Sequence, residues 1–392
     1  MTRPPILHGP GVRTTLFYVV FFAATGVHMP FWPLWLENWG LTAAEVGLFG
    51  ALGMAVRVAA GLVIPTLADR LDRRRLTIAA CMATGAALFV AHLWIGSKAV
   101  LLLATLAVGA CFAGIGPIAE ALGVAASRAY AFPYAQARGL GSLGFLAANL
   151  AVGAALATVG VELALWWIVG CLAVGAALVM RHPGARRAQA QTPPSLREIG
   201  RLIVNPVFAL FVAASACLQA SHATFFALGT VHWAALGVSE AKIGALWAAS
   251  VAAEVVFMVA VGAWTVVRLG AVRAMALSGI AGVLRWGAML GDPTGAALWP
   301  LQALHALTFG AGHLGAMAFI AEAVPARYGA AAQGAMGSMA VGLLLAIGMA
   351  AAAALYPAIG GLTYGIGVIF SALGLGLCAL LARRWRGGAL AV

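Results

Sequence analysis

Twelve runs of about 20 apolar residues follow one another along the chain, and each is long enough to cross the hydrocarbon core of a bilayer. Hydrophobic residues make up 63% of the 392 residues and charged residues 9%, whereas a typical soluble domain has about 25% charged residues. This composition excludes a soluble enzyme and a disordered chain, and it predicts an all-α membrane protein with twelve transmembrane helices. The expected spans are 14–36, 45–67, 76–96, 99–124, 137–158, 162–181, 206–231, 241–266, 272–291, 296–321, 330–354 and 361–383.

One long polar stretch, residues 182–205, separates the sixth run from the seventh, and it is basic and contains prolines. It divides the chain into an N-terminal bundle of six helices (1–181), a cytoplasmic linker (182–205) and a C-terminal bundle of six helices (206–392). Within the linker, the piece Pro194–Glu198 is expected to form a short surface helix.

The two halves carry matched basic loops. The loop Ala68–Arg75 follows the second run, and the weaker loop Val267–Arg273 follows the eighth run, at the equivalent place in the second half. Two pseudo-symmetric six-helix bundles with a matched loop indicate an internal duplication, which is the architecture of many secondary transporters. We expect a solute cavity between the halves near the middle of the membrane.

The basic residues set the expected orientation. If the N-terminus is cytoplasmic, the inner side holds 18 of the 23 lysines and arginines, and the outer side holds only Lys98 and Lys242. Such an asymmetry places both termini in the cytoplasm of a multi-pass protein of the bacterial plasma (inner) membrane. The net charge of +12 therefore reflects orientation and does not indicate a nucleic-acid partner. The three remaining basic residues, Arg57, Arg138 and Arg285, fall within the apolar runs.

Other function classes find no support in the sequence. The five cysteines all lie in apolar runs, without CxxC spacing or histidines nearby, so we expect small packing residues and neither a disulfide nor a metal site. No Walker sequence indicates ATP-driven transport, and no nucleophile and base are paired as in an enzyme. We therefore expect no cofactor and no catalytic residue.

The loop Asp69–Arg74 reads D-R-x-x-R-R and lies between the second and third runs. It resembles the loop signature of the major facilitator superfamily, except that Pro65 stands where a glycine is usual. The resemblance implies the major facilitator fold and transport by alternating access, and it implies that Asp69 and Arg73 act in a cytoplasmic gate. Plain anchoring at the membrane surface remains an alternative for the two arginines that follow Arg73.

A narrower resemblance is carried by stretches in several runs. Pro30–Leu36 with Gly40–Thr42, Val283–Gly287, and Leu301–Phe309 with His313-Leu314 resemble the phenylpropionate permease family. Its members are proton-coupled importers of aromatic acids, and the family is similar to the lactose permease group. The resemblance spans nearly the whole chain.

Ionised residues within the membrane are the best functional candidates, because each costs roughly 2.5–3.5 kcal/mol on insertion scales. Glu120 and Arg138 should face each other across a helical hairpin, and their spacing equals that of the sugar-binding pair in lactose permeases. Arg138 could hold a substrate carboxylate for which Glu120 competes, or the two could form a structural ion pair. Arg57 lies between Gly53 and Gly61 on one helix face and suits an anionic ligand, or it could bond to backbone carbonyls.

Glu254, Arg285 and His305 form the candidate set of the second half. The step from Arg285 to His305 is that of lactose permeases, but Thr308 stands where those proteins have a proton-carrying glutamate. Glu254 is the remaining proton carrier, since a carboxyl that moves between a buried setting and Arg285 could bind and release a proton. Alternatives are a permanent Glu254–Arg285 salt bridge, a titrating His305, and a His305 that only bonds between helices. Trp286 is expected at the cavity, stacked on a substrate ring or on a guanidinium.

Four further polar residues are weaker candidates for the cavity, and hydrogen bonds between helices explain them as well. They are Gln219, His222, Gln302 and His313. The sequence as a whole predicts a monomeric secondary transporter of a small organic solute, with an aromatic carboxylate imported with protons as the first hypothesis. The alternatives are a sugar or nucleoside proton symporter and a drug or metabolite exporter of the same fold. The expected partners are the substrate, protons and the lipid bilayer.

Overall fold

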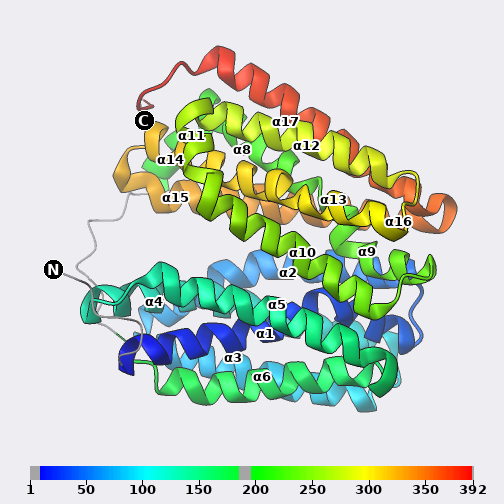
Figure 1. Ribbon diagram of the computed structural model, residues 1–392. Coiled ribbons are helices and arrows are strands. Elements are labelled where there is room, and N and C mark those ends of the chain that lie inside the picture. The colour runs from blue at the N-terminus through cyan, green and yellow to red at the C-terminus, as the bar shows by residue number, and fades with distance from the viewer. Residues whose placement is uncertain (1–8, 185–195, 391–392) are drawn as a thin grey trace. The chain divides into compact units, whose positions relative to one another are not determined.

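The computed structural model describes residues 9–184 and 196–390, and within these ranges every regular element is a helix (Figure 1). The chain divides into two compact units. Unit 1 comprises Met1–Leu41, Leu52–Gln189 and Ser239–Ala248, and unit 2 comprises Thr42–Ala51, Ala190–Val238 and Ala249–Val392. The first residues of the second expected run belong to unit 2, and those of the eighth expected run belong to unit 1. The division into the halves 1–181 and 206–392 stays a prediction.

The first half of the chain forms six long helices, which agree with the first six expected spans. They are α1 (Gly9–Asn38), α2 (Ala43–Arg70), α3 (Arg74–Ala91, extended by the 3-10 turn His92–Trp94), α4 (Lys98–Tyr130), α5 (Tyr134–Val159) and α6 (Glu162–Met180). α1 packs against α5 and α6, and α3 packs against α4 and α6. At Gly26 the backbones of α1 and α5 approach so closely that a Cβ would lie 2.7 Å from the carbonyl oxygen of Phe145.

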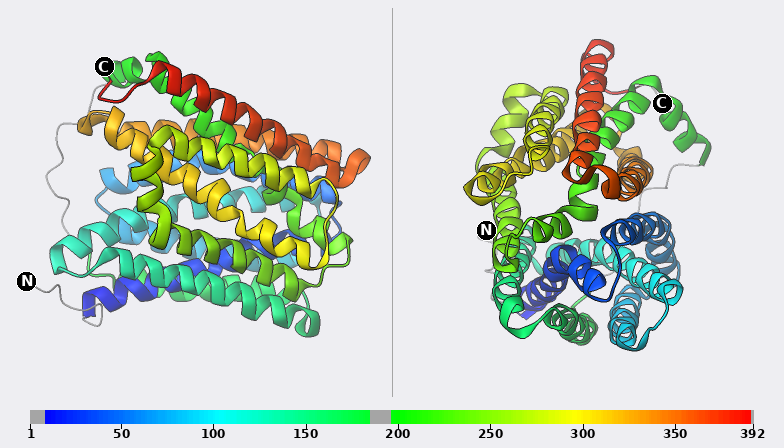
Figure 2. Two further views of the ribbon diagram at one scale, coloured as in Figure 1. Left: turned by 45° about the horizontal axis from the view of Figure 1, so that its top comes forward. Right: turned by 90° about the vertical axis from the view of Figure 1, so that its right-hand side faces the viewer.

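The second half is more interrupted. Its elements are α7 (Leu196–Val204), α8 (Pro206–Ala220), α9 (Ala223–Ala235), α10 (Glu240–Phe257), η2 (Met258–Gly262), α11 (Ala263–Leu269), α12 (Ala271–Met289), η3 (Gly295–Ala297), α13 (Leu298–Ala303), η4 (Ala306–Ala311), α14 (Gly312–Ala323), η5 (Ala326–Tyr328), α15 (Gly329–Gly334), η6 (Ala335–Leu343), α16 (Leu344–Ile359), η7 (Gly360–Tyr364) and α17 (Gly365–Arg384). Figure 2 shows the helices of each unit from two further directions. α7 is the short helix expected in the linker, although its expected start at Pro194 lies outside the described residues.

Local sequence signals explain where several helices begin and end. Thr42 and Glu45 form a capping box before α2: the Thr42 N–H donates to Glu45 Oε2 (2.9 Å), and the Glu45 N–H donates to Thr42 Oγ1 (3.3 Å). Asn205 caps α8 by accepting hydrogen bonds from two backbone N–H groups, and Pro206 occupies the first helical position. Gly160, with φ +96°, ends α5 in a conformation that a side chain would strain.

Ten segments of the described chain are long and apolar enough to cross a membrane. One of them, Leu344–Arg384, contains parts of the last two expected spans, 330–354 and 361–383, and α16 ends within it just before Gly360. The expected span 272–291 is α12, which is not among the ten. The count of twelve therefore depends on dividing the last segment at Gly360 and on including α12.

The helices of unit 2 that were expected to be continuous contain irregular segments. The run 206–231 breaks between α8 and α9, where the Ser221 hydroxyl donates to the carbonyl of Leu218 (2.7 Å) and so competes with the helical ladder. Three segments, η2, η4 and η6, are π-helical. A π-helical segment widens the hydrogen-bonded turn by one residue and is frequent at functional sites.

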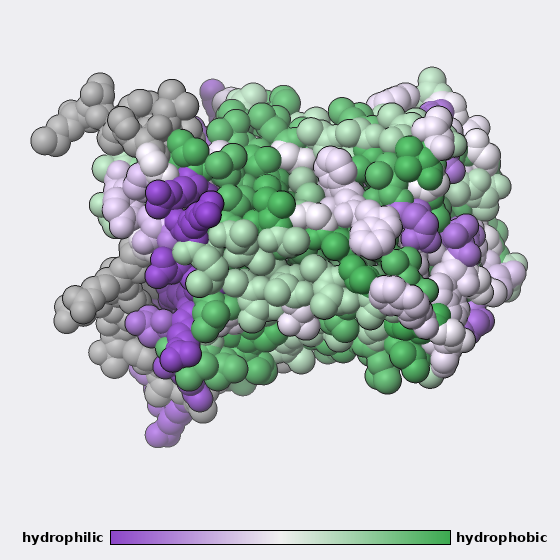
Figure 3. Space-filling view, turned by 90° about the horizontal axis from the view of Figure 1, so that it is seen from below, coloured by the Kyte–Doolittle hydropathy of each residue, from purple (hydrophilic) through white to green (hydrophobic). Residues whose placement is uncertain are grey.

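The face of the molecule drawn in Figure 3 has an apolar middle. On the face drawn in Figure 3, hydrophobic residues cover the central band and hydrophilic residues gather mainly toward one end. In unit 1, exposed arginines lie at the ends of α2, α3 and α6; they are Arg70, Arg73, Arg75 and Arg181. This distribution matches a helix bundle that meets hydrocarbon at its middle and water at its ends.

His182, just after the end of α6, forms hydrogen bonds to α1 and α3 at the arginine-rich end of unit 1. Its Nδ1 accepts from the Gly184 N–H (3.2 Å), so its Nε2 carries the hydrogen and donates to Thr14 Oγ1 of α1 (3.0 Å). Its backbone carbonyl accepts from Arg75 of α3 (3.0 Å). Burial and the positive charge of Arg75 lower the pKa of His182 from 6.5 to about 4.

We expect this histidine to make the protein less stable in acid. Between pH 6.5 and 4 the unfolded chain binds a proton at His182 that the folded chain does not, so the free energy of unfolding falls as the pH is lowered through this range. The full effect corresponds to roughly 3 kcal/mol of unfolding free energy. The apparent Tm of the detergent-purified protein, measured from pH 8 to pH 4, should decline less steeply for His182→Gln. An unchanged slope would contradict this assignment.

Candidate functional site

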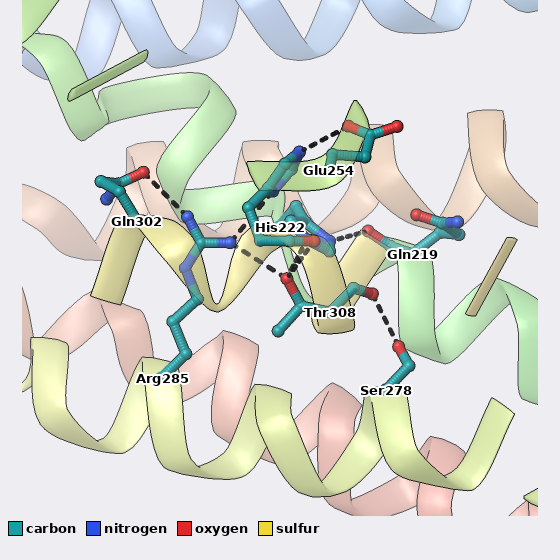
Figure 4. A network of polar contacts seen from close by, with 8 residues as sticks. Gln219, His222, Glu254, Ser278, Arg285, Gln302 and Thr308 are labelled. Atoms are coloured by element: carbon teal, nitrogen blue, oxygen red, sulfur yellow. Dashed lines mark hydrogen bonds and ion pairs between the residues drawn. The ribbon is translucent and has the colours of Figure 1, made fainter. Parts of the chain in front are cut away.

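Arg285 of α12 is completely buried in unit 2 and forms the centre of a polar network (Figure 4). One guanidinium nitrogen donates to His305 Nδ1 (3.1 Å) and to Thr308 Oγ1 (3.0 Å), and the other donates to Gln302 Oε1 (3.0 Å). The helix α13–η4 thus presents three acceptors to one cation. A guanidinium fits this arrangement because it carries several donors in a rigid plane.

The hydrogen bond from Arg285 decides the protonation state of His305. A guanidinium can only donate, so His305 Nδ1 must accept and His305 Nε2 must carry the ring hydrogen. That nitrogen lies 3.4 Å from Glu254 Oε2. His305 is therefore a neutral link between the arginine and the carboxylate in this arrangement, and a second proton on its ring would face the guanidinium.

A second arm of the network runs through Thr308 to His222, which lies at the break between α8 and α9. His222 Nδ1 donates to the backbone carbonyl of Gln219 (3.1 Å), so its Nε2 accepts from the Thr308 hydroxyl (3.1 Å). The Ser278 hydroxyl donates to the Thr308 carbonyl (2.6 Å) within the π-helical segment η4. Donor and acceptor are therefore assigned for each hydrogen bond of this arm, and the series of hydrogen bonds begins at Arg285.

Aromatic rings cover the remaining faces of the arginine. The guanidinium carbon of Arg285 lies 4.4 Å from the ring centre of Trp286 and 5.3 Å from that of Phe225. Trp286 is itself buried: it stacks on Tyr364 (6.0 Å, 9°) and donates its indole N–H to Ser221 Oγ (3.2 Å). Of the two roles considered for Trp286, its position in the structure corresponds to stacking on the guanidinium.

The positive charge of Arg285 and the negative charge of Glu254 are linked through His305 in this network. Glu254 is the one acidic side chain among the residues of the network shown in Figure 4, and His305 separates it from Arg285. The Nε atom of Arg285 is buried without a hydrogen-bond partner in the described chain. A buried cation whose counter-charge is reached only through a neutral ring is well suited to attract an anionic ligand.

Unit 1 contains the expected pair of Glu120 and Arg138. Arg138 Nε donates to Glu120 Oε1 (2.6 Å), and the Tyr134 hydroxyl bonds to the other carboxylate oxygen. The Arg138 guanidinium also lies over the ring of Phe22 at 4.1 Å. The side chains of Arg138 and Glu120 remain 38% and 43% exposed, so water or a ligand can reach both. The expectation that α4 and α5 bring this pair together is confirmed.

Arg57 occupies the middle of α2, beside Gly109 of α4. In the described part of the chain it has no hydrogen bond or ion pair, but its charge acts on His28 of α1. His28 stacks on Phe112 of α4, with 4.9 Å between the ring centroids. A cation and an imidazole therefore lie on neighbouring helices of unit 1.

The basic loop contains an ion pair. Asp69 Oδ1 accepts from Arg74 Nε at 2.6 Å, so the arginine that pairs with Asp69 is Arg74 and not Arg73, the arginine to which the resemblance assigned a gate role. Arg73 precedes the first residue of α3 and its side chain is exposed, while Arg74 lies one residue further and reaches back across the turn. The gate role of this loop remains a prediction.

The four weaker candidates divide into two groups. His222 and Gln302 belong to the Arg285 network through their side chains, and Gln219 belongs to it through its backbone carbonyl. His313 lies outside it, at a separate cavity of unit 2. The described residues contain no group of three or more His, Cys, Asp or Glu side chains that could hold a metal ion.

Sequence reasoning missed several members of the two sites. Thr308 joins both arms of the network, whereas the sequence indicated only that it replaces a glutamate of the lactose permeases. Its position three residues after His305, on the same helix face, was the available signal. Tyr134, Phe22 and Ser278 gave no comparable signal, because single aromatic or hydroxyl residues in apolar runs are ordinary.

The chain is similar to known protein families and relatives over most of its length. The model of the MFS_1 like family matches residues 12–364. A probable 3-phenylpropionic acid transporter of Escherichia coli (strain K12) is 29% identical over 324 residues, which cover 78% of this chain and 81% of that protein. A maltose permease of Geobacillus stearothermophilus is 27% identical over 294 residues, which cover 73% of each protein.

Solved structures agree on the fold. The crystal structure of the nucleoside transporter NupG matches with a TM-score of 0.78 at 17% identity, over 96% of this chain and 98% of that chain. An inward-facing, unoccupied bacterial homologue of the human lysosomal transporter Spinster matches with a TM-score of 0.69 at 16% identity, over 95% of this chain and 96% of that chain. The chain is thus a multi-pass membrane protein that belongs to the MFS_1 like family, and it is a transporter of the major facilitator superfamily.

Proposed function

We propose that this transporter imports a small organic anion, an aromatic carboxylate in the first place, together with a proton. The observation that carries the proposal is the buried Arg285, which reaches the carboxylate of its network, Glu254, only through His305. The halves 1–181 and 206–392, joined by the linker 182–205, alternate in exposing the site. The protein works as a monomer in a bacterial inner membrane, with both termini cytoplasmic because the basic residues gather on that side.

Charge balance links the proton to the anion. With Glu254 ionised, the positive charge of Arg285 and the negative charge of Glu254 compensate each other across His305. When Glu254 binds a proton, the network keeps the charge of Arg285 and loses its counter-charge. A substrate carboxylate then restores neutrality, so one proton and one monovalent anion move together.

Unit 1 has a position of its own that suits an anion. Arg138 is held by Glu120 but remains accessible, so a substrate carboxylate can compete with Glu120 for the planar guanidinium. Arg57 offers a second positive charge in the same unit, and this charge acts on His28. A substrate with a carboxylate can therefore meet an arginine in either unit.

The relatives support the substrate class without deciding it. The Escherichia coli relative is described as a transporter of 3-phenylpropionic acid, which is an aromatic carboxylate. A maltose permease and a nucleoside transporter are also similar to this chain, and both act on uncharged hydroxylated solutes. The preference for an anion rests on the arginine networks.

Uptake into proteoliposomes tests the proposal. We expect a transmembrane pH gradient, acidic outside, to drive accumulation of 3-phenylpropionate, and a potential imposed at equal pH to drive none, because the proton and anion cancel in charge. Accumulation of a sugar or nucleoside with no carboxylate transport would refute the proposed substrate class. Carboxylate uptake that follows the potential would refute the coupling.

Glu254→Gln separates binding from coupling. A glutamine resembles the protonated carboxyl, so this variant should still exchange labelled for unlabelled substrate across the membrane while losing accumulation driven by the pH gradient. Glu240→Gln, at the start of the same helix α10, is the matched control and should retain both activities. Accumulation by Glu254→Gln at the wild-type level would show that the proton is carried elsewhere.

A further inference from the structure

The cavity of unit 2 at which His313 lies has a volume of about 240 Å³ and is beside the Arg285 network. We propose that it is the subsite for the ring of the substrate and that it selects a ring bearing a hydroxyl group. The inference rests on the proposed function and specifies the substrate class further, as ring-hydroxylated aromatic carboxylates. The residues that define the cavity in this argument are Ser215, Gln219, Phe309, His313, Met336 and Gly337.

One wall of the cavity is continuous with the network. Phe309 stacks on His305 (ring centroids 5.3 Å apart, planes at 20°), and His313 stacks on Phe309 (6.3 Å, 12°). The three rings follow each other at intervals of four residues and share one face of the helix. A substrate whose carboxylate meets the Arg285 network can therefore lay its ring along the Phe309 side of the cavity.

Three polar groups of the cavity have no hydrogen-bond partner in the described chain. The Ser215 hydroxyl is buried and unpaired. The Gln219 carboxamide and the imidazole nitrogens of His313 likewise make no hydrogen bond to a described residue, although His313 interacts electrostatically with Glu254. Buried polar groups usually have partners, so the unpaired hydroxyl of Ser215 beside this volume indicates that a ligand supplies one. Gln219 and His313 are partly exposed and face the same volume with further polar groups.

The size and lining of the cavity limit what it can receive. Pockets for drug-sized ligands measure roughly 300–1,000 Å³, so this volume suits a single ring with a short chain and is small for a disaccharide. The Phe309 ring and Met336 provide apolar contacts, while the hydroxyl, amide and imidazole can each donate or accept a hydrogen bond. A phenolic hydroxyl, which also donates and accepts, matches these groups.

Gly337 allows the cavity to be filled without disturbing the network. A Cβ at Gly337 would meet no atom within 4 Å, and the same holds for Gly334, which does not line the cavity. In Gly337→Leu, we expect the Kd for 3-phenylpropionate and its ring-hydroxylated derivatives to rise at least tenfold, while the Kd for butyrate, which has no ring, stays within twofold. Gly334→Leu is the matched control and should bind all probes as the wild type does.

Ser215→Ala tests the preference for a ring hydroxyl independently. It can contradict the inference even if Gly337→Leu does not fold. The wild type should bind at least one ring-hydroxylated derivative of 3-phenylpropionate more tightly than the parent acid. Ser215→Ala should reduce this preference by about fivefold to tenfold, with little change for the parent acid. Binding is measured by thermal shift or calorimetry on the full-length protein in detergent.

The outcomes separate this inference from the proposed function. If the wild type binds no carboxylate, the proposed function fails and the ring subsite fails with it. If it binds aromatic carboxylates but Gly337→Leu weakens butyrate and phenylpropionate alike, or weakens neither, the subsite is wrong and the proposed function stands. If the hydroxyl preference is absent or survives in Ser215→Ala, the selection for a hydroxylated ring is wrong.

Discussion

Arg285→Lys is expected to lower the initial rate of substrate uptake at least about 100-fold, despite keeping the positive charge. A lysine ammonium is a point donor and cannot bond to His305, Thr308 and Gln302 at once, as the planar guanidinium does. Losing two hydrogen bonds from a charged group amounts to roughly 3–6 kcal/mol, which corresponds to a factor of about 100 or more. The rate is measured in proteoliposomes and normalised to folded protein.

Arg273→Lys is the matched control for this experiment. Arg273 lies on the same helix, α12, but its side chain is exposed, so its replacement should change the rate less than twofold. A thermal unfolding curve for Arg285→Lys shows whether the folded state survives. Near-normal uptake by a folded Arg285→Lys protein would remove the main support for the proposed function.

Changes at Glu120 and Arg138 should act on substrate affinity in opposite directions. Arg138→Gln removes the accessible guanidinium, and we expect the KM for a carboxylate substrate to rise at least tenfold, since a charged hydrogen bond is worth about 1.5–3 kcal/mol. Glu120→Gln removes the competitor for Arg138, so the KM should fall, while kcat falls too because the substrate is released more slowly.

Arg128→Gln, an exposed position near the end of α4, is the control for both variants and should leave kcat and KM unchanged. Concentration-dependent uptake under a fixed pH gradient gives the two constants. If Glu120→Gln raised the KM as much as Arg138→Gln did, the pair would be a structural ion pair and not a substrate contact.

Two contacts of these sites were foreshadowed by the sequence: the hairpin predicted that Glu120 faces Arg138, and the resemblance to lactose permeases placed Arg285 and His305 in one set. The step of 18 residues between Glu120 and Arg138 spans a helical hairpin, and the step of 20 residues between Arg285 and His305 spans another; in both cases the side chains meet. Hairpin geometry fixes such contacts because the two helices are antiparallel and their connection is short. The helical architecture followed equally directly from the apolar runs.

The rest depended on features that sequence periodicity does not report. A pattern with 3.6 residues per turn does not show where a helix widens into a π-helical segment, so the place of Thr308 within η4 and of Ser278 beneath it could not be derived. The pairing of Asp69 with Arg74 depends on the shape of one turn, which the row of adjacent arginines leaves open. The cavity at Gly337 arises from volume left between helices, which no single residue encodes.

The fixed direction of the hydrogen bonds around Arg285 determines whether protons can leak through the network. Protons hop along a chain only if each member can pass one on, and an arginine does not give up its proton in a protein. Arg285 therefore prevents proton transfer between the arm that ends at Glu254 and the arm that ends at the Gln219 carbonyl. We therefore expect no proton leak along this hydrogen-bonded chain when no substrate is bound.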